Sequence, residues 1–325
     1  MTDLATLTTE ALNPRTADID RLDTADILLR LNDEDATVAA QVRLAIPEIA
    51  RAVDLALERW RAGGRIILFG AGTSGRLAAL DAAELIPTFG APPDRYAARI
   101  AGGENAFRRP IEGAEDDVAD GANVPDDLTP SDVAIGIAAS GRTPWVIAAL
   151  RRAGERGAAR IGIACVAQPA LAAECDVTIA VETGAEAISG STRLKAGTAQ
   201  KMILNAFSTA LMVRLGKVYG NLMVDVLATN EKLRARAVRL TCLATGVDDE
   251  RARAVLATAD WSVKTAIVAI HFGTDIETAR ARLEAVDGMT RLALEPQATE
   301  ALGAQASVPR PSAPIAENPC QDNVD

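Results

Sequence analysis

The chain has 325 residues, of which 49% are hydrophobic and 24% charged, which is enough for one large core or two smaller ones. Its formal net charge of −10, without a Lys/Arg block, argues against nucleic-acid binding, because that affinity comes mostly from neutralising phosphates. A single histidine, His271, leaves almost no material for a histidine metal site or a Ser-His-Asp triad. Asp, Glu, Lys or Tyr would therefore have to supply any acid or base for catalysis.

Nothing in the sequence predicts export or a membrane partner. The N-terminus is acidic and lacks an apolar signal-peptide core, and no run reaches the roughly 18 apolar residues that span a bilayer. The cysteines fit neither a metal motif nor a dense disulfide framework, which favours free thiols in a reducing cytosol. They are Cys165, Cys175, Cys242 and Cys320. We therefore expect a cytoplasmic protein.

Amphipathic helical patterns cover residues 24–31 and 35–62, and Pro47 is expected to divide the second pattern or to start a new helix. Five apolar runs bounded by turns then alternate with helical patterns. Such alternation predicts an α/β fold, a five-stranded parallel sheet flanked by helices. The expected strands are residues 65–70, 95–103, 132–140, 159–167 and 176–183.

Beyond the sheet, residues 198–239 have a helical pattern with a turn expected near 216–220. Residues 248–294 read as three short helices of a small bundle. The remainder is rich in Pro, Ala and Ser, lacks periodicity and is expected to be disordered. The predicted organisation is an N-terminal helical segment (1–60), a sheet domain (61–240), a helical bundle (245–295) and a tail (296–325).

Glycine and hydroxyl residues follow two of the strands, in GAGTSGR (70–76) and SGRTP (140–144), and a third cluster, SGSTRLK (189–195), precedes a helix. Glycines let the backbone approach an anion, and free N–H groups at a helix start favour negative charge. The candidate phosphate-binding residues are Thr73, Ser74, Gly75, Ser140, Gly141, Arg142, Thr143, Ser191, Thr192 and Lys195. Two alternatives stay open: the hydroxyls cap helices, and Arg142 or Lys195 forms a structural ion pair.

The stretch GAGTSG also fits the dinucleotide fingerprint G-x-G-x-x-G, which alone is weak evidence. That fingerprint needs an acidic residue at the end of the next strand, where this chain has Ile100-Ala101-Gly102-Gly103. A Walker A motif is absent. A small phosphorylated ligand therefore explains the loops better than a dinucleotide does.

Two carboxylates are candidates for proton transfer. Glu84 lies in LDAAELIP, at the far end of the helix that begins in the first loop, and Glu115 lies in GAEDD after the second strand. Their spacing does not pair them, but a βαβ crossover can bring them to one site. Two carboxylates in different environments can divide acid and base roles. The alternative is that both are solvated surface side chains.

The motifs together resemble the N-acetylmuramic acid 6-phosphate etherases, a family of the sugar isomerase (SIS) domain group. The longest matching stretches are GAGTSGRLAALDAAE, EGAEDD, GIAASGRTP, GSTRLKAGTAQK and RLGKVYGNLMVD. Shorter matches are Asn13-Pro14 and residues 32–35, 87–90 and 100–103. The resemblance covers roughly residues 8–295.

This resemblance implies an SIS fold with a ubiquitin-associated-like C-terminal bundle, a homodimer, and no cofactor or metal. It implies cleavage of the D-lactyl ether of N-acetylmuramate 6-phosphate in the recycling of cell-wall sugars. Glu84 would be the proton donor to the departing lactate oxygen, and Glu115 the base at C2. Two alternatives are a non-catalytic sugar-phosphate sensor similar to glucokinase regulatory proteins and an SIS aldose–ketose isomerase.

The chain departs from the family pattern in two places. Cys165 is followed by Val166-Ala167-Gln168-Pro169 where the family usually has Cys-Asn-Pro, and Gly184-Ala185-Glu186 stands where Gly-Pro-Glu is common. Both are expected near ligand-side loops, and both leave the two glutamates intact.

Overall fold

The computed structural model describes residues 8–124 and 126–295, so the expected tail and Cys320 lie outside it. The chain forms two compact units. The first is Met1–Glu84 with Pro92–Leu211, and the second is Leu85–Ala91 with Met212–Asp325. Compactness alone does not define a domain, so the domain limits expected from the sequence stay predictions.

A five-stranded parallel sheet forms the centre of the first unit, in the order β2-β1-β3-β4-β5. The strands are β1 Ile66–Gly70, β2 Tyr96–Ile100, β3 Val133–Ile137, β4 Ala159–Ala164 and β5 Val177–Ala180. Every residue of β1 and β3 is buried, which explains their unbroken apolar sequences. The predicted α/β fold is confirmed.

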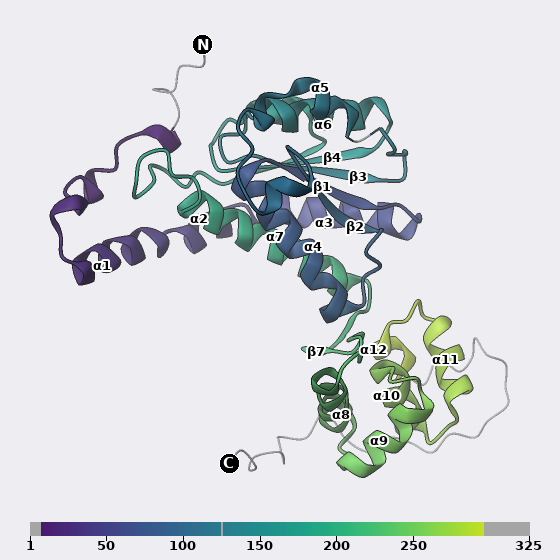
Figure 1. Cartoon of the computed structure of the whole chain (residues 1–325). Coiled ribbons are helices and arrows are strands. Elements are labelled where there is room, and N and C mark those ends of the chain that lie inside the picture. Colours follow the sequence, from purple (N-terminus) through teal and green to yellow (C-terminus); the bar gives the residue numbers. More distant parts are fainter. Residues whose placement is uncertain (1–7, 125, 296–325) are drawn as a thin grey trace. The chain divides into compact units, whose positions relative to one another are not determined.

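Helices cover both faces of this sheet, with α5 (Val118–Asn123) and α6 (Pro144–Glu155) on one face and α4 (Gly72–Phe89) and α7 (Lys195–Arg214) on the other (Figure 1). Trp145 and Leu150 of α6 are buried against the sheet in a core that includes Phe69. Short 3-10 segments lie at Thr8–Glu10, Pro14–Thr16, Ile19–Arg21, Glu104–Phe107, Ala114–Asp116 and Ala170–Glu174.

Three helices precede the sheet: α1 Thr24–Asp35, α2 Val38–Leu44 and α3 Ile46–Arg61. Pro47 lies in the first turn of α3, where its missing N–H has no helical partner to lose, so the predicted start of a new helix is confirmed. α3 buries a full apolar stripe, whereas Glu34 is the one buried residue of α1. α1 therefore gains little from packing within the chain.

Helices α4 and α7 lie side by side and run in the same direction. Ser74 donates to Gln200 Oε1 at 3.0 Å, and two turns later Ser208 donates to Asp81 Oδ1 at 3.0 Å. The Tyr96 hydroxyl also donates to Asp81, at 2.8 Å. Burial is the main cause that raises the pKa of Asp81. These contacts align the first turns of both helices at the carboxyl edge of the sheet.

The second unit contains the end of α4, a hairpin of β6 (Val218–Tyr219) and β7 (Leu222–Met223), and five helices. The helices are α8 Glu231–Thr245, α9 Asp249–Thr258, α10 Val263–Phe272, α11 Ile276–Glu284 and α12 Thr290–Ala293. The expected helical bundle is confirmed, with four helices, α9 to α12, where the sequence predicted three. The turn expected near residues 216–220 is confirmed, because positive φ angles at Gly216 and Gly220 turn the chain into the hairpin. The helical pattern expected on either side of it is wrong between 215 and 230, where the chain forms no helix.

Within the described residues no single helix is long and apolar enough to cross a membrane, and α9 with α10 passes that test only as a pair bent by 112°. Cys165 and Cys175 are free thiols, as the sequence predicts. Burial raises the pKa of Cys165 and of Cys175 to about 12.

Candidate functional site

The first glycine-rich loop joins β1 to α4 by close backbone packing. A Cβ on Gly75 would lie 2.5 Å from Ile100 Cγ1 and 2.8 Å from the Gly70 carbonyl oxygen. Only glycine therefore lets the helix start this close to the strands. Ser74 is 7% exposed and is held by its hydrogen bond to Gln200, a residue that sequence reasoning did not single out.

The second loop, residues 138–143, leaves the strand next to the first. β1 and β3 pair in parallel, with Gly70 opposite Ile137, and paired strands lie about 4.8 Å apart. Because parallel strands end at one edge of a sheet, the two hydroxyl loops come together as the sequence predicts.

Residues 140–143 make a tight turn into α6. Gly141 has a φ of +67°, and a Cβ there would lie 2.3 Å from Pro169 Cβ. The backbone N–H of Arg142 donates to the Ser140 hydroxyl at 3.3 Å. Thr143 is the N-cap residue of α6, yet its side chain makes no capping hydrogen bond. Helix capping therefore does not account for this hydroxyl.

The third cluster, residues 189–195, leads into α7, whose first turn lies against the first loop. A Cβ on Gly197 would lie 3.4 Å from the Thr192 carbonyl oxygen and 3.6 Å from Thr73 Cγ2. Thr73 and both candidate phosphate-binding hydroxyl residues of the cluster are half-buried. The proximity of Thr73 to Gly197 and the hydrogen bond of Ser74 to Gln200 together hold the first loop against the start of α7, which the third cluster precedes.

Lys195 forms a buried ion pair with Glu34. Its Nζ donates to Glu34 Oε2 at 2.8 Å, and each side chain is 2% exposed. Arg15 Nη2 donates to the same oxygen at 2.8 Å. The Arg15 hydrogen bonds are the main cause that lowers the pKa of Glu34 to about 2, against the effect of burial. The ion-pair alternative for Lys195 is therefore present, and phosphate binding by Lys195 stays a prediction.

Four short motifs meet around this ion pair, and sequence reasoning gave no role to three of them. Asn13 Nδ2 donates to the Ala185 carbonyl oxygen at 3.3 Å, across 172 residues of sequence. The Glu186 carboxylate accepts the N–H groups of Lys195 at 2.8 Å and Ala196 at 2.9 Å and so caps α7. Burial is the main cause that raises the pKa of Glu186. The motifs at Asn13-Pro14 and residues 32–35 were visible, but nothing in their spacing predicts that they meet.

Glu84 is an exposed residue of α4, twelve positions after Gly72. A helix of that length rises about 18 Å. A group bound at the first turn of α4 is therefore separated from Glu84 by three turns of the same helix.

Glu115 is exposed and lies in the 3-10 segment Ala114–Asp116, beyond β2. Arg76 fixes the chain between β2 and this 3-10 segment, because its Nη2 donates to the Ala106 carbonyl oxygen at 2.8 Å. Asp117, two positions after Glu115, is the N-cap residue of α5 and accepts the Asp120 N–H at 2.9 Å. In the described part of the chain no hydrogen bond or ion pair joins Glu84 to Glu115, so their roles stay predictions.

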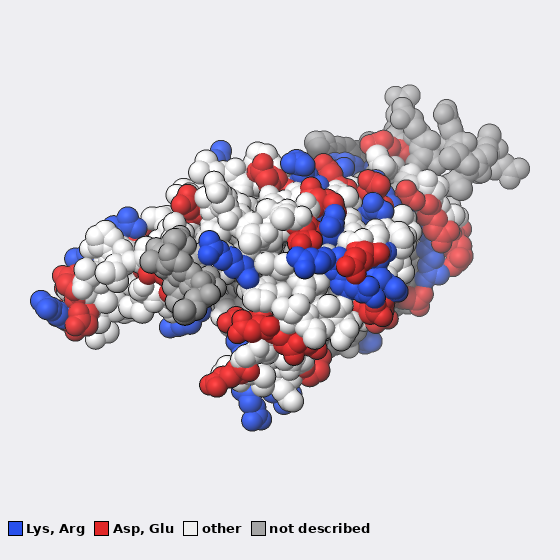
Figure 2. Space-filling model, turned by 90° about the horizontal axis from the view of Figure 1, so that it is seen from above, with Lys and Arg blue, Asp and Glu red and all other residues white. Residues whose placement is uncertain are grey.

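Residues 8–124 and 126–295 contain no group of three or more His, Cys, Asp or Glu side chains placed to hold a metal ion. On the face that Figure 2 presents, acidic and basic side chains are interspersed.

Comparison with known proteins bears directly on these loops. Family models match residues 114–210 (SIS domain) and 48–154 (glucokinase regulatory protein N-terminal SIS domain). An N-acetylmuramic acid 6-phosphate etherase of Streptomyces avermitilis is 51% identical over 294 residues, which cover 90% of this chain and 94% of that protein. Its counterpart in Thermobifida fusca is 55% identical over 262 residues, 81% of this chain and 86% of that protein. The chain belongs to the N-acetylmuramic acid 6-phosphate etherase family.

The etherase family resemblance expected from the sequence is thus confirmed. Among solved structures, a phosphoheptose isomerase from Francisella tularensis is similar over 59% of this chain and 100% of its own, at 16% identity and a TM-score of 0.46. Both departures from the etherase pattern can now be located. Pro169 packs against Gly141 of the second loop, and Ala185 accepts the hydrogen bond from Asn13.

Proposed function

We propose that this etherase-family chain cleaves the D-lactyl ether of N-acetylmuramate 6-phosphate, giving N-acetylglucosamine 6-phosphate and D-lactate. One observation carries the proposal: three hydroxyl loops converge in a chain whose relatives, at 51% and 55% identity, are named for this substrate. The glucokinase regulatory protein model covers only residues 48–154, and it does not favour a sensor over an enzyme.

The phosphate is expected among the hydroxyls of the three loops. The side chain of Thr143 makes no capping hydrogen bond, and Thr73 and Thr192 approach one turn of α7. The α4 N-terminus adds free backbone N–H groups and the positive end of its helix dipole. Binding energy at the phosphate then holds the reacting carbons in place.

The chemistry is an elimination followed by addition of water. Opening of the sugar to its aldehyde acidifies the C2 proton, which Glu115 removes as the base. Glu84 protonates the C3 ether oxygen as the C3–O bond breaks, and D-lactate leaves. Water then adds its oxygen to C3 and returns a proton to C2, and the ring closes. A positioned acid or base typically contributes about 10²–10⁴-fold to such a step.

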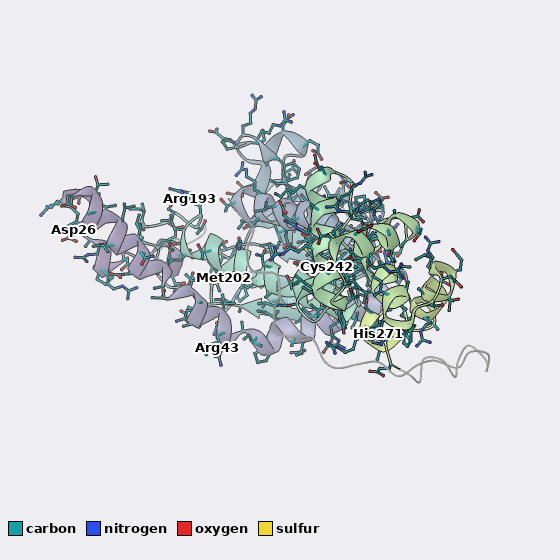
Figure 3. The ribbon with its side chains drawn as sticks, turned by 90° about the horizontal axis from the view of Figure 1, so that it is seen from below. Asp26, Arg43, Arg193, Met202, Cys242 and His271 are labelled. Carbon is teal, nitrogen blue, oxygen red and sulfur yellow. The ribbon has the colours of Figure 1, made fainter. Side chains whose placement is uncertain are left out.

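We further propose that the enzyme is a homodimer whose sites are shared. A hexose 6-phosphate is much shorter than the roughly 18 Å that separate the first turn of α4 from Glu84, so Glu84 suits a site built on the partner's loops. α1 offers a surface for such pairing. It extends from the rest of its unit, with Asp26 near its outer end (Figures 1 and 3), and Leu28 and Leu29 are each 61% exposed.

Cytoplasmic action in the recycling of cell-wall sugars is the setting proposed for this reaction. It is supported by the free thiols of Cys165 and Cys175, since disulfides are rare in reducing compartments.

A coupled assay for D-lactate tests the proposed function. Purified protein incubated with N-acetylmuramate 6-phosphate is expected to release one D-lactate for each N-acetylglucosamine 6-phosphate formed. A sensor would bind the sugar without turnover, and an isomerase would convert sugar phosphates without lactate. Either result would contradict the proposal.

A further inference from the structure

A pocket of about 460 Å³ lies beside the start of α7, where Lys195 of the third hydroxyl cluster lines it. Its walls include Asn13, Arg15, Thr37, Gln41, Thr183 and Lys195. Small-molecule sites usually occupy roughly 300–1,000 Å³, so the pocket has room for part of a sugar derivative. Neither the phosphate site nor the two glutamates account for it.

Lys195 and Arg15 meet at one carboxylate beside this pocket. Both donate to Glu34 Oε2, at 2.8 Å each. Lys195 is 2% exposed, which makes its charge costly without partners. Arg15 is 62% exposed, so water screens its charge, and the buried ion pair is that of Lys195 with Glu34.

Hydrogen-bond donors are also left over there. The Lys195 ammonium has three N–H groups, and among the described residues Glu34 is its one side-chain acceptor. The Thr183 hydroxyl is buried without any hydrogen-bond partner, and that residue is 5% exposed. Buried donors are normally satisfied, so both groups favour a ligand that accepts hydrogen bonds.

Two further acidic residues lie close by, and neither accepts a hydrogen bond from the Lys195 ammonium among the described residues. Glu182 lines the pocket but is exposed, so water solvates its carboxylate. Glu186 is directed at the backbone N–H groups of Lys195 and Ala196. The pocket therefore still presents a buried cation to an entering anion.

The pocket lies within one substrate length of the phosphate loops. Thr192 and Lys195 are three residues apart, so their Cα atoms are separated by at most about 11 Å. The hydrogen bond from the Gly197 N–H to the Thr192 carbonyl oxygen, at 2.9 Å, folds this stretch into a turn and shortens the span. One molecule can therefore reach both places.

We propose that this pocket binds the lactyl carboxylate of the substrate, with Lys195 as its charge partner and Thr183 as a hydroxyl donor. The inference rests on the proposed function, because the lactyl carboxylate is the one anionic group of N-acetylmuramate 6-phosphate besides the phosphate. The product N-acetylglucosamine 6-phosphate lacks it. The pocket would thus distinguish substrate from sugar product.

The test compares two constants in the full-length enzyme: KM for N-acetylmuramate 6-phosphate, and the inhibition constant of N-acetylglucosamine 6-phosphate. Lys195→Gln should raise KM by about 10–100-fold, the value of a charge-assisted hydrogen bond, and leave the inhibition constant within about twofold. Thr183→Val keeps the shape of the side chain and should raise KM by about three- to tenfold with the same selectivity. Arg43→Gln, which removes an exposed cation of α2, is the matched control and should change neither constant.

An equal rise of both constants in the two pocket variants, or no change in either, would overturn the pocket assignment. If Lys195→Gln fails to fold in a thermal unfolding scan, Thr183→Val decides the question by itself. Failure of the proposed function would look different, because the wild-type protein would then release no lactate at all.

Discussion

Glu84 and Glu115 are both exposed and lie on separate elements, so geometry alone does not distinguish acid from base. The proposed chemistry distinguishes them, because it predicts different effects for the two variants. Glu84→Gln should stop lactate release but still allow exchange of the C2 proton with deuterated water, because the base is intact. Glu115→Gln should abolish both. Each variant should lose about 10²–10⁴-fold in turnover.

Nuclear magnetic resonance of the substrate C2 proton and a lactate assay would measure these two effects. Glu58→Gln, at an exposed acid of α3, serves as the control and should keep both activities. Near-native turnover in both active-site variants would show that the carboxylates are assigned wrongly.

The buried carboxylate of Glu34 predicts how stability depends on pH. Its pKa is lowered from the ordinary 4.5 to about 2, first by Arg15 and then also by Lys195. Its ion pairs therefore contribute stability above pH 4.5, and the contribution is lost as the pH falls toward 2. Because Arg15 is largely exposed and screened, we expect a loss on the order of 2 kcal/mol.

Urea unfolding at several pH values between 6 and about 2 would measure this effect. Glu34→Gln should flatten the pH dependence in that window and lower stability throughout it, since it leaves Lys195 buried beside a neutral amide. Asp33→Asn, at the exposed neighbouring position, should retain the wild-type pH dependence. An unchanged slope in Glu34→Gln would contradict the role given to this pair.

At the scale of elements, the junction of β1 and α4 depends on the absence of side chains. A Cβ on Gly75 would meet Ile100 at 2.5 Å and the backbone at Gly70. Gly75→Ala should therefore lower the unfolding free energy by about 1–3 kcal/mol through overpacking. Gly197→Ala is the matched comparison, because its Cβ would make ordinary contacts at 3.4 Å or more. It should be neutral or stabilising by up to about 1 kcal/mol.

The elements most accurately predicted from sequence are the ones that bury both faces. β1 and β3 are unbroken apolar runs ended by glycine, and their limits differ from prediction by only a few residues. A parallel sheet places the loops that follow its strands at one edge, but the pairing of β1 with β3, which makes the first two loops neighbours, comes from the structure. The turn after Arg214 was predicted from Gly216 and Gly220, but its strands were not, because β6 and β7 have two residues each and so show no periodicity.

The pocket cluster could not be predicted for a different reason. Asn13, Glu34, Ala185 and Lys195 come from segments far apart in the sequence, and no local periodicity encodes their contact. Lys195 was named for phosphate binding because it stands in a hydroxyl-rich cluster. Only the fold shows the carboxylate that faces it.

At the scale of the molecule, α1 is difficult to explain in a single copy. It has twelve residues with one of them buried, and isolated helices shorter than about 12–15 residues are marginal in water. Burial of Leu28 and Leu29 in a dimer would contribute about 1.5–3 kcal/mol each. Leu28→Asp combined with Leu29→Asp should therefore convert a dimer to monomers and reduce turnover, if the sites are shared.

Light scattering coupled to size-exclusion chromatography would measure the mass of each variant. Leu292→Asp, which places the same charge at an exposed leucine of α12, should leave the mass unchanged. A wild-type protein that runs as a monomer while fully active would exclude the shared site.

The central claim, elimination of lactate from a sugar phosphate held by the three loops, is tested most directly by the fate of solvent oxygen. The enzyme would be incubated with N-acetylmuramate 6-phosphate in heavy-oxygen water, and both products analysed by mass spectrometry. The proposed elimination and rehydration place one solvent oxygen on C3 of the sugar and none in D-lactate. Solvent oxygen in the lactate, with none on the sugar, would contradict it.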